Sequence, residues 1–136
     1  MSKKEPSSFA WVSYTTELDN VYITVDAHKR LYLSSAVPKK LGLKTPISLY
    51  IGYDHANKRL VVAKPEVVKA VDVKPHRFDK RRYCSAKAFI RSLAIEDSEL
   101  PLRFAYAGKD FSEYPAGAFV FQLTDFVAPD DAMPAE

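Results

Sequence analysis

The sequence predicts a mostly β fold with short helices, in which two copies of a β-β-α-β-β module follow each other on one chain. Short runs of alternating β-branched and aromatic residues predict the strands, and Gly, Pro, Asn and Asp between the runs predict turns. The order of these elements repeats in the second half, which is typical of an internal duplication. A single module of about 50 residues buries little surface alone. We therefore expect the two copies to form one pseudo-dimeric barrel.

The first half shows the module most clearly. An additional strand is predicted at 9–16, because this stretch is rich in aromatic and β-branched residues. Ser34 or Ser35 can cap the short helix that follows the second strand of the module, and Gly42 is expected to end it. The module itself is predicted as strands at 21–25 and 30–33, a helix at 36–41, and strands at 47–53 and 59–63.

The second half follows the same plan after a basic turn at 79–82. Ser85 can cap its helix. Its last two strands are separated by a longer loop at 108–116. The predicted elements are a short strand at 83–84, a helix at 86–93, and strands at 102–106 and 117–123.

Side chains of similar size and polarity recur when the halves are superimposed. Placing Arg30 over Arg82 also places the hydrophobic residues of the two helices over each other. With one inserted residue, 49–53 then matches 102–106. The connector between the halves forms either one helical turn or an extended linker. The predicted organisation is a flexible lead at 1–8, a first module with the N-terminal strand at 9–65, the connector at 66–77, a second module at 78–124 and an acidic disordered tail at 125–136.

The charge distribution is more informative than the net charge of +3. Four acidic residues and no lysine or arginine lie in 125–136, so residues 1–124 carry a net charge of +7 (3 plus 4). A basic body with an acidic tail suits a polyanionic partner. The alternative is an ordinary solvated surface with a solubilising tail.

Several classes of protein lack support in the sequence. The single cysteine, Cys84, excludes an intrachain disulfide and is expected to be a buried thiol. No apolar run reaches the roughly 18 residues of a membrane span, and no signal peptide is recognised, so we expect a cytoplasmic protein. No nucleophile elbow, phosphate loop or metal-ligand spacing is present. We therefore expect no enzyme activity and no cofactor or metal.

Residues 23–43 carry a family resemblance. Asp26 and Arg30 lie in a turn between two strands, Pro38 lies in the short helix, and Leu41-Gly42 ends it. This stretch resembles the AbrB/SpoVT/MazE-like swapped-hairpin superfamily, and the tandem arrangement is similar to MraZ-like members. The sequence departs from the family pattern at Lys29, where glycine is usual. The resemblance implies interlocked hairpins, and many family members bind DNA as dimers through basic residues in the turn and around the helix.

The basic residues occupy similar places in both halves, and pseudo-symmetry is expected to bring the two clusters onto one face. We predict that they contact duplex phosphates, as in a DNA-binding transcriptional regulator of AbrB-like type that is either a monomeric pseudo-dimer or a homodimer. Solvated surface charges are the alternative. Arg30 and Arg82 can instead pair with Asp26 and Asp79 to hold the turns. The predicted nucleic-acid-binding residues are Lys29, Arg30, Lys39, Lys40, Lys44, Lys80, Arg81, Arg82, Lys87 and Arg91.

A second hypothesis is a protein-binding module, such as an antitoxin-like protein or an inhibitor of a host factor. The loop at 108–116 departs most from the first half and carries Phe111 and Tyr114. Exposed aromatic residues on a long loop favour a protein contact, whereas packing against the barrel is the alternative. Some tyrosines can stack on bases, although aromatic residues that alternate in strands are more typical of a core. They are Tyr14, Tyr22, Tyr32, Tyr50 and Tyr53.

Overall fold

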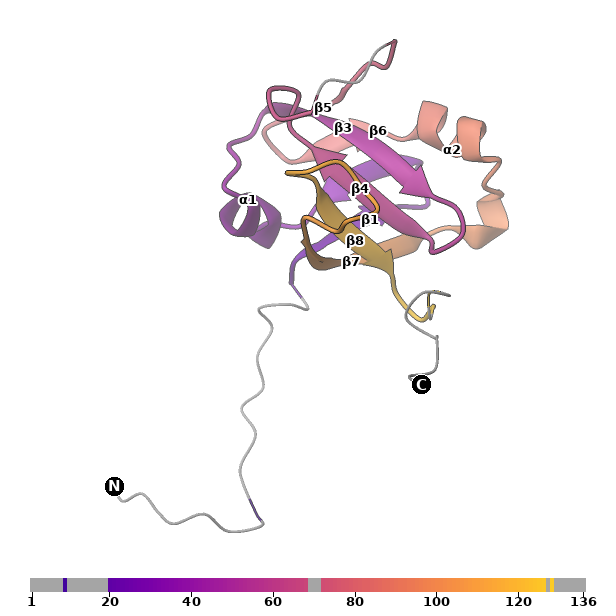
Figure 1. Ribbon diagram of the computed structural model, residues 1–136. Coiled ribbons are helices and arrows are strands. Elements are labelled where there is room, and N and C mark those ends of the chain that lie inside the picture. Colours follow the sequence, from indigo (N-terminus) through magenta and orange to yellow (C-terminus); the bar gives the residue numbers. More distant parts are fainter. Residues whose placement is uncertain (1–8, 10–19, 69–71, 127, 129–136) are drawn as a thin grey trace.

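The computed structural model describes residue 9, residues 20–68, residues 72–126 and residue 128. Within these residues, eight antiparallel strands form a nearly closed barrel with a few short helices (Figure 1). The predicted mostly β fold with short helices is therefore confirmed. The predicted lead, the N-terminal strand after Phe9 and most of the acidic tail lie outside the described residues.

Both halves of the described chain contain the elements in the same order, with a 3-10 helix added in the second half. The first half contains β1 (Tyr22–Val25), β2 (Arg30–Leu33), α1 (Ala36–Leu41), β3 (Ile47–Asp54) and β4 (Arg59–Ala63). The second contains β5 (His76–Phe78), β6 (Tyr83–Ser85), α2 (Lys87–Leu93), η1 (Asp97–Glu99), β7 (Leu102–Lys109) and β8 (Phe119–Leu123).

Hairpins of the two halves alternate along the sheet, in the strand order β5-β3-β4-β8-β7-β1-β2-β6. The first strand of each half pairs with the third strand of the other, as β1 with β7 and β5 with β3. Among the described residues, the remaining strand pairings between the halves are β2 with β6 and β4 with β8. The end strands β5 and β6 are joined by a tight turn, in which the Asp79 N–H donates to the Tyr83 carbonyl at 2.9 Å. Neither half therefore has a complete sheet of its own.

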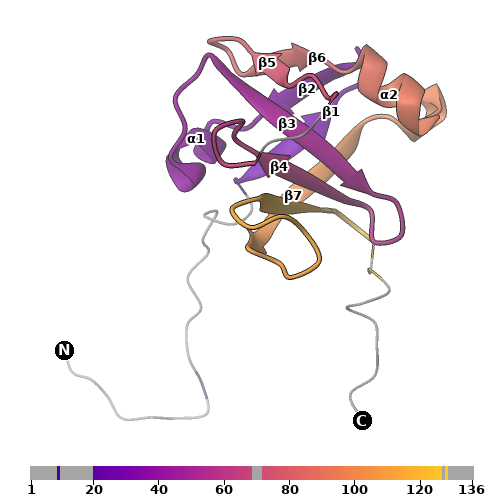
Figure 2. The same cartoon turned by 45° about the horizontal axis from the view of Figure 1, so that its top comes forward.

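The core fills the inside of this barrel because alternate residues of each strand point inward. Ile23, Leu31, Phe78 and Phe104 have no exposed surface, and Leu49 has only 1%. Burial of each such side chain stabilises the fold by about 1.5–3 kcal/mol. The helices α1 and α2 lie at opposite ends of the barrel (Figures 1 and 2), and each adds two buried side chains to the core.

The predicted end of the first helix is confirmed, and of the two predicted caps the structure has Ser35 at the N-cap position. Gly42 adopts a left-handed conformation with φ of 70° at the end of α1, where glycine avoids steric strain. Ser35 is the N-cap but makes no capping hydrogen bond with its side chain. Ser34 is buried, and its hydroxyl donates to the Asn20 carbonyl and accepts from the Tyr22 N–H instead. Its side chain thus fixes the start of β1.

Element boundaries differ from the prediction where strands are short or continue into loops. β5 begins at His76, inside the predicted connector, and β7 continues to Lys109. In α2 the N-cap is Ala86, although the Ser85 hydroxyl does accept a hydrogen bond from the Lys87 N–H at 3.3 Å. The described part of the connector contains a turn, and residues 69–71 lie outside the described residues. In the part of the chain that the structure describes, no helix is long and apolar enough to cross a membrane.

Candidate functional site

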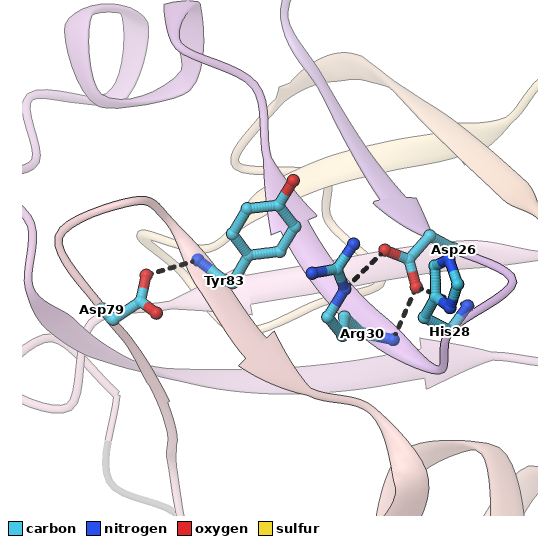
Figure 3. A network of polar contacts seen from close by, with 5 residues as sticks. All are labelled: Asp26, His28, Arg30, Asp79 and Tyr83. Atoms are coloured by element: carbon cyan, nitrogen blue, oxygen red, sulfur yellow. Dashed lines mark hydrogen bonds and ion pairs between the residues drawn. The ribbon is translucent and has the colours of Figure 1, made fainter.

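Two aspartate-held turns form the centre of the candidate site. The Asp26 Oδ1 atom accepts the backbone N–H groups of His28 and Arg30, each at 2.9 Å (Figure 3). Asp79 Oδ1 likewise accepts the N–H groups of Arg81 and Tyr83, each at 2.9 Å. A short side-chain acceptor that satisfies two nearby backbone donors is a common way to hold a tight turn. The two turns therefore have the same backbone construction.

This construction changes the correspondence between the halves. Lys29 and Arg82 both adopt the left-handed conformation, with φ of 62° and 72°. Counted from the aspartate, Arg82 corresponds to Lys29, and Tyr83 corresponds to Arg30. The predicted match of Arg30 with Arg82 is therefore wrong by one residue, because it followed side-chain identity, whereas the aspartate sets the backbone position.

The two arginines also differ in their partners. Arg30 Nε donates to Asp26 Oδ2 at 2.8 Å, so the predicted alternative of a turn-holding ion pair is confirmed for Arg30. Arg82 makes no such pair with Asp79 in the described structure. Its Nε donates to the Leu33 carbonyl and its Nη2 to the Tyr32 hydroxyl, each at 3.0 Å. Arg82 therefore fastens the second turn to a strand of the first half.

Tyrosine rings separate the two arginines on the outside of the β2–β6 pair. Tyr32 and Tyr83 are register partners, and their ring centroids are 4.7 Å apart. The guanidinium carbon of Arg30 lies 4.3 Å from the centroid of the Tyr83 ring. Figure 3 shows these two side chains between the two turns. Arg82 lies 5.5 Å from the Tyr32 ring. Cation–π contacts of this kind hold flat, charged groups in fixed orientations.

Each turn lies beside the entrance to a helix. The Ala86 N–H, just before α2, donates to the Lys29 carbonyl at 2.8 Å. The Leu33 N–H, at the end of the strand before α1, donates to the Arg82 carbonyl at 3.0 Å. The Lys29 ammonium also lies 3.4 Å from the Asp97 carboxylate. A shallow depression of about 200 Å³ is lined by Lys29, Lys87, Ile90 and Arg91. The structure thus groups a first-half turn with the second-half helix.

The other predicted basic residues are exposed but more scattered. Lys39 and Lys40 lie in the last turn of α1, at the opposite end of the barrel from α2, and Lys44 follows that helix. Lys80 and Arg81 are exposed in the second turn.

The loop after β7 packs against the barrel. The Tyr114 hydroxyl donates to the Asp54 carboxylate. This bond, supported by hydrogen bonds from Asn57 and Ala56, lowers the pKa of Asp54 to about 2, although partial burial acts in the opposite direction. The Phe111 and Tyr114 rings stack with centroids 6.0 Å apart. Both predicted protein-contact residues are thus partly covered and held in place.

A pocket of about 410 Å³ lies beside this loop, on the outer side of β3 and β4. Small residues of the sheet, Gly52, Val61 and Ala63, contribute to its lining, and most of the other lining residues are apolar or aromatic. They are Tyr50, Tyr53, Asp54, Val68, Tyr114, Pro115 and Ala118.

Two further titratable groups pack into the barrel. Cys84 is free and half-buried against the core, and burial raises the pKa of its thiol. Burial lowers the pKa of His76, and its Nδ1 atom has no hydrogen-bond partner in the described structure. Among the described residues, no three histidine, cysteine, aspartate or glutamate side chains gather in a way that suits a metal ion.

Comparisons with models of protein families, with curated proteins and with solved structures give no match for this chain.

Proposed function

We propose that this protein is a DNA-binding transcriptional regulator on a tandem swapped-hairpin fold of AbrB-like type. Three features support the fold assignment: the exchange of strands between halves, the two equivalent aspartate-held turns, and the left-handed residues Gly42 and Ala94 at the ends of the helices. Pro46 and Pro101 also stand directly before the third strand of each half. The proposal includes no catalytic step and no cofactor.

The observation that carries the DNA-binding proposal is the grouping of cations around each turn. Lys29 lies beside Lys87 and Arg91 across the boundary between halves, and Lys80 and Arg81 are exposed in the second turn. Lysine and arginine side chains on rigid turns contact duplex phosphates and release counterions, which makes binding steeply dependent on salt. Arginine can also reach guanine edges in the major groove. One chain supplies two such turns, so a monomer can contact DNA twice.

A salt titration tests this proposal. We expect the protein to bind a random-sequence duplex in fluorescence anisotropy, more tightly at low salt than near physiological salt. The variant Lys29→Gln/Lys87→Gln/Arg91→Gln should weaken binding and reduce the slope of log affinity against log salt by roughly 3 if each cation meets one phosphate.

The matched control removes three exposed cations elsewhere, as Lys74→Gln/Arg77→Gln/Lys109→Gln. It should leave the slope nearly unchanged. Equal weakening by both triple variants, or no duplex binding at low salt, would contradict the proposal.

The pocket beside the 108–116 loop favours a second candidate, a protein-binding module of the antitoxin-like or inhibitor kind. Its apolar lining and its Tyr114 and Pro115 edge suit an apolar side chain of a partner. If this candidate holds, Pro115→Asp should abolish capture of the partner and leave the fold intact, while the triple glutamine variant should have no effect on it.

A further inference from the structure

Four neighbouring strands align polar and aromatic side chains in one row on the outside of the barrel. Thr24 of β1 is the register partner of Arg103 on one side and of Tyr32 on the other. Tyr32 is in turn the partner of Tyr83. The row Arg103–Thr24–Tyr32–Tyr83 therefore crosses β7, β1, β2 and β6 directly, and it combines both halves of the chain.

Every arginine on this face lies against a tyrosine. The guanidinium carbon of Arg103 is 3.7 Å from the centroid of the Tyr22 ring, the shortest such distance in the described structure. Arg30 contacts Tyr83 and Arg82 contacts Tyr32, as described above. We call this surface the arginine–tyrosine face; it consists of Tyr22, Arg30, Tyr32, Arg82, Tyr83 and Arg103.

These rings do not build the barrel interior. Their strand neighbours Ile23 and Leu31 point inward and are fully buried, whereas Tyr22, Tyr32 and Tyr83 are half-buried and lie outside the core of the described residues. The sequence pattern favoured core positions for Tyr22 and Tyr32, and the strand alternation places them on the outer side instead.

The face keeps a positive charge. Of its three arginines, only Arg30 is ion-paired with a carboxylate within the described residues. Arg82 donates to a carbonyl and a hydroxyl, which leave its charge uncompensated. Arg30 and Arg103 are exposed. The surface thus offers flat cations and rings held in fixed positions by their mutual contacts.

We infer that the arginine–tyrosine face binds single-stranded nucleic acid, with unpaired bases stacked on its guanidinium groups and tyrosine rings. Bases splayed from a single strand stack on aromatic and guanidinium planes, and cations attract the backbone between them. Bases of a duplex already stack on each other, and half-buried rings cannot enter a groove to reach them. The inference rests on the proposed nucleic-acid function. It assigns single-stranded nucleic acid to the arginine–tyrosine face, whereas the proposed function assigns duplex DNA to the basic residues of the turns and of α2.

Two probes of the same sequence test the inference: a twelve-nucleotide single strand that carries 2-aminopurine, and its duplex. We expect the single strand to bind in fluorescence anisotropy and the 2-aminopurine emission to be quenched by stacking. Arg103→Ala should weaken single-strand binding about tenfold, which is within the range of one lost stacking contact. Its effect on duplex binding should be less than about threefold, the size of one phosphate contact or less.

Lys109→Ala is the matched control, because Lys109 lies at the other end of the same strand and its ammonium is 5.4 Å from the Phe119 ring. It should change single-strand affinity by less than about threefold, as for one distant charge. Tyr83→Phe should preserve the quenching, whereas Tyr83→Leu should reduce it; a circular-dichroism melt checks that both variants are folded.

The outcomes separate the inference from the proposed function. Duplex binding without single-strand binding overturns the inference alone, and absence of both overturns both. Single-strand binding that Arg103→Ala and Lys109→Ala weaken equally also overturns the inference, because it shows attraction by charge without stacking. A loss specific to Arg103 and Tyr83→Leu supports it.

Discussion

The turn between β1 and β2 and the turn between β5 and β6 share a backbone but differ in chemistry. In both, an aspartate accepts two backbone N–H groups, and the fourth residue is left-handed. In the first turn, the residue after the left-handed one is Arg30, whose side chain donates a hydrogen bond to Asp26. In the second it is Tyr83, and the left-handed Arg82 reaches across to Tyr32 and Leu33. Backbone geometry therefore constrains the aspartate much more than the cations around it.

The largest expected effect comes from removing the shared aspartate. Asp26→Ala and Asp79→Ala each leave two backbone donors without their acceptor, and each net hydrogen bond contributes about 0.5–1.5 kcal/mol. We expect each variant to lose about 1–3 kcal/mol of unfolding free energy in urea denaturation. Asp26→Ala should lose slightly more, because it also breaks the exposed ion pair with Arg30. A loss near zero for Asp79→Ala would contradict the equivalence of the two turns.

The left-handed residues should respond differently to truncation. Arg82→Ala removes two hydrogen bonds to the other half and should cost about 1–2 kcal/mol of unfolding free energy. Lys29→Ala removes only an exposed ion pair with Asp97, which is worth at most about 1 kcal/mol. Urea denaturation of both variants in parallel measures the difference, and equal losses would show that Arg82 is only a surface charge.

A smaller, pH-dependent difference is expected between β1 and β5. β5 pairs with β3 in the same way as β1 pairs with β7. In the first pair His76 lies opposite Leu49, and in the second Ile23 lies opposite Phe104, so His76 and Ile23 occupy equivalent positions. Burial lowers the pKa of His76 below 6.5, so the unfolded chain binds a proton more readily than the folded chain. Stability should therefore fall as pH drops from 7 through 6.5. Thermal melts at pH 7 and pH 5.5 measure this loss of stability, which should be smaller in the His76→Ile variant than in the original protein. An equal loss in both proteins would show that other groups cause the pH dependence.

Sequence reasoning succeeded where a pattern is long or a residue has one structural use. The strands Arg30–Leu33 and Arg59–Ala63 have their predicted bounds, and Gly42 ends its helix as expected. It missed β5, since His76–Phe78 is too short to display a periodicity. Of the two candidate caps, Ser35 is at the N-cap, whereas the buried Ser34 bonds to Asn20 and Tyr22 at the start of β1.

The candidate site was predictable only as single residues. The basic side chains could be named from their types and positions, and the ten predicted cations are exposed or half-exposed. Which side chains become neighbours was not predictable, because the pairing of β2 with β6 brings Lys29 to Lys87 and Arg30 to Tyr83. Arg103 was missed for the same reason. A row of side chains across four strands exists only after the register is set.

The exchange of strands between halves has a mechanical consequence. β1 is hydrogen-bonded to β7 and β3 to β5, so separating the halves would break ladders on both sides of the barrel at once. The two halves of the described chain therefore share one eight-stranded sheet. A partner that binds the described barrel thus meets a surface to which both halves contribute strands.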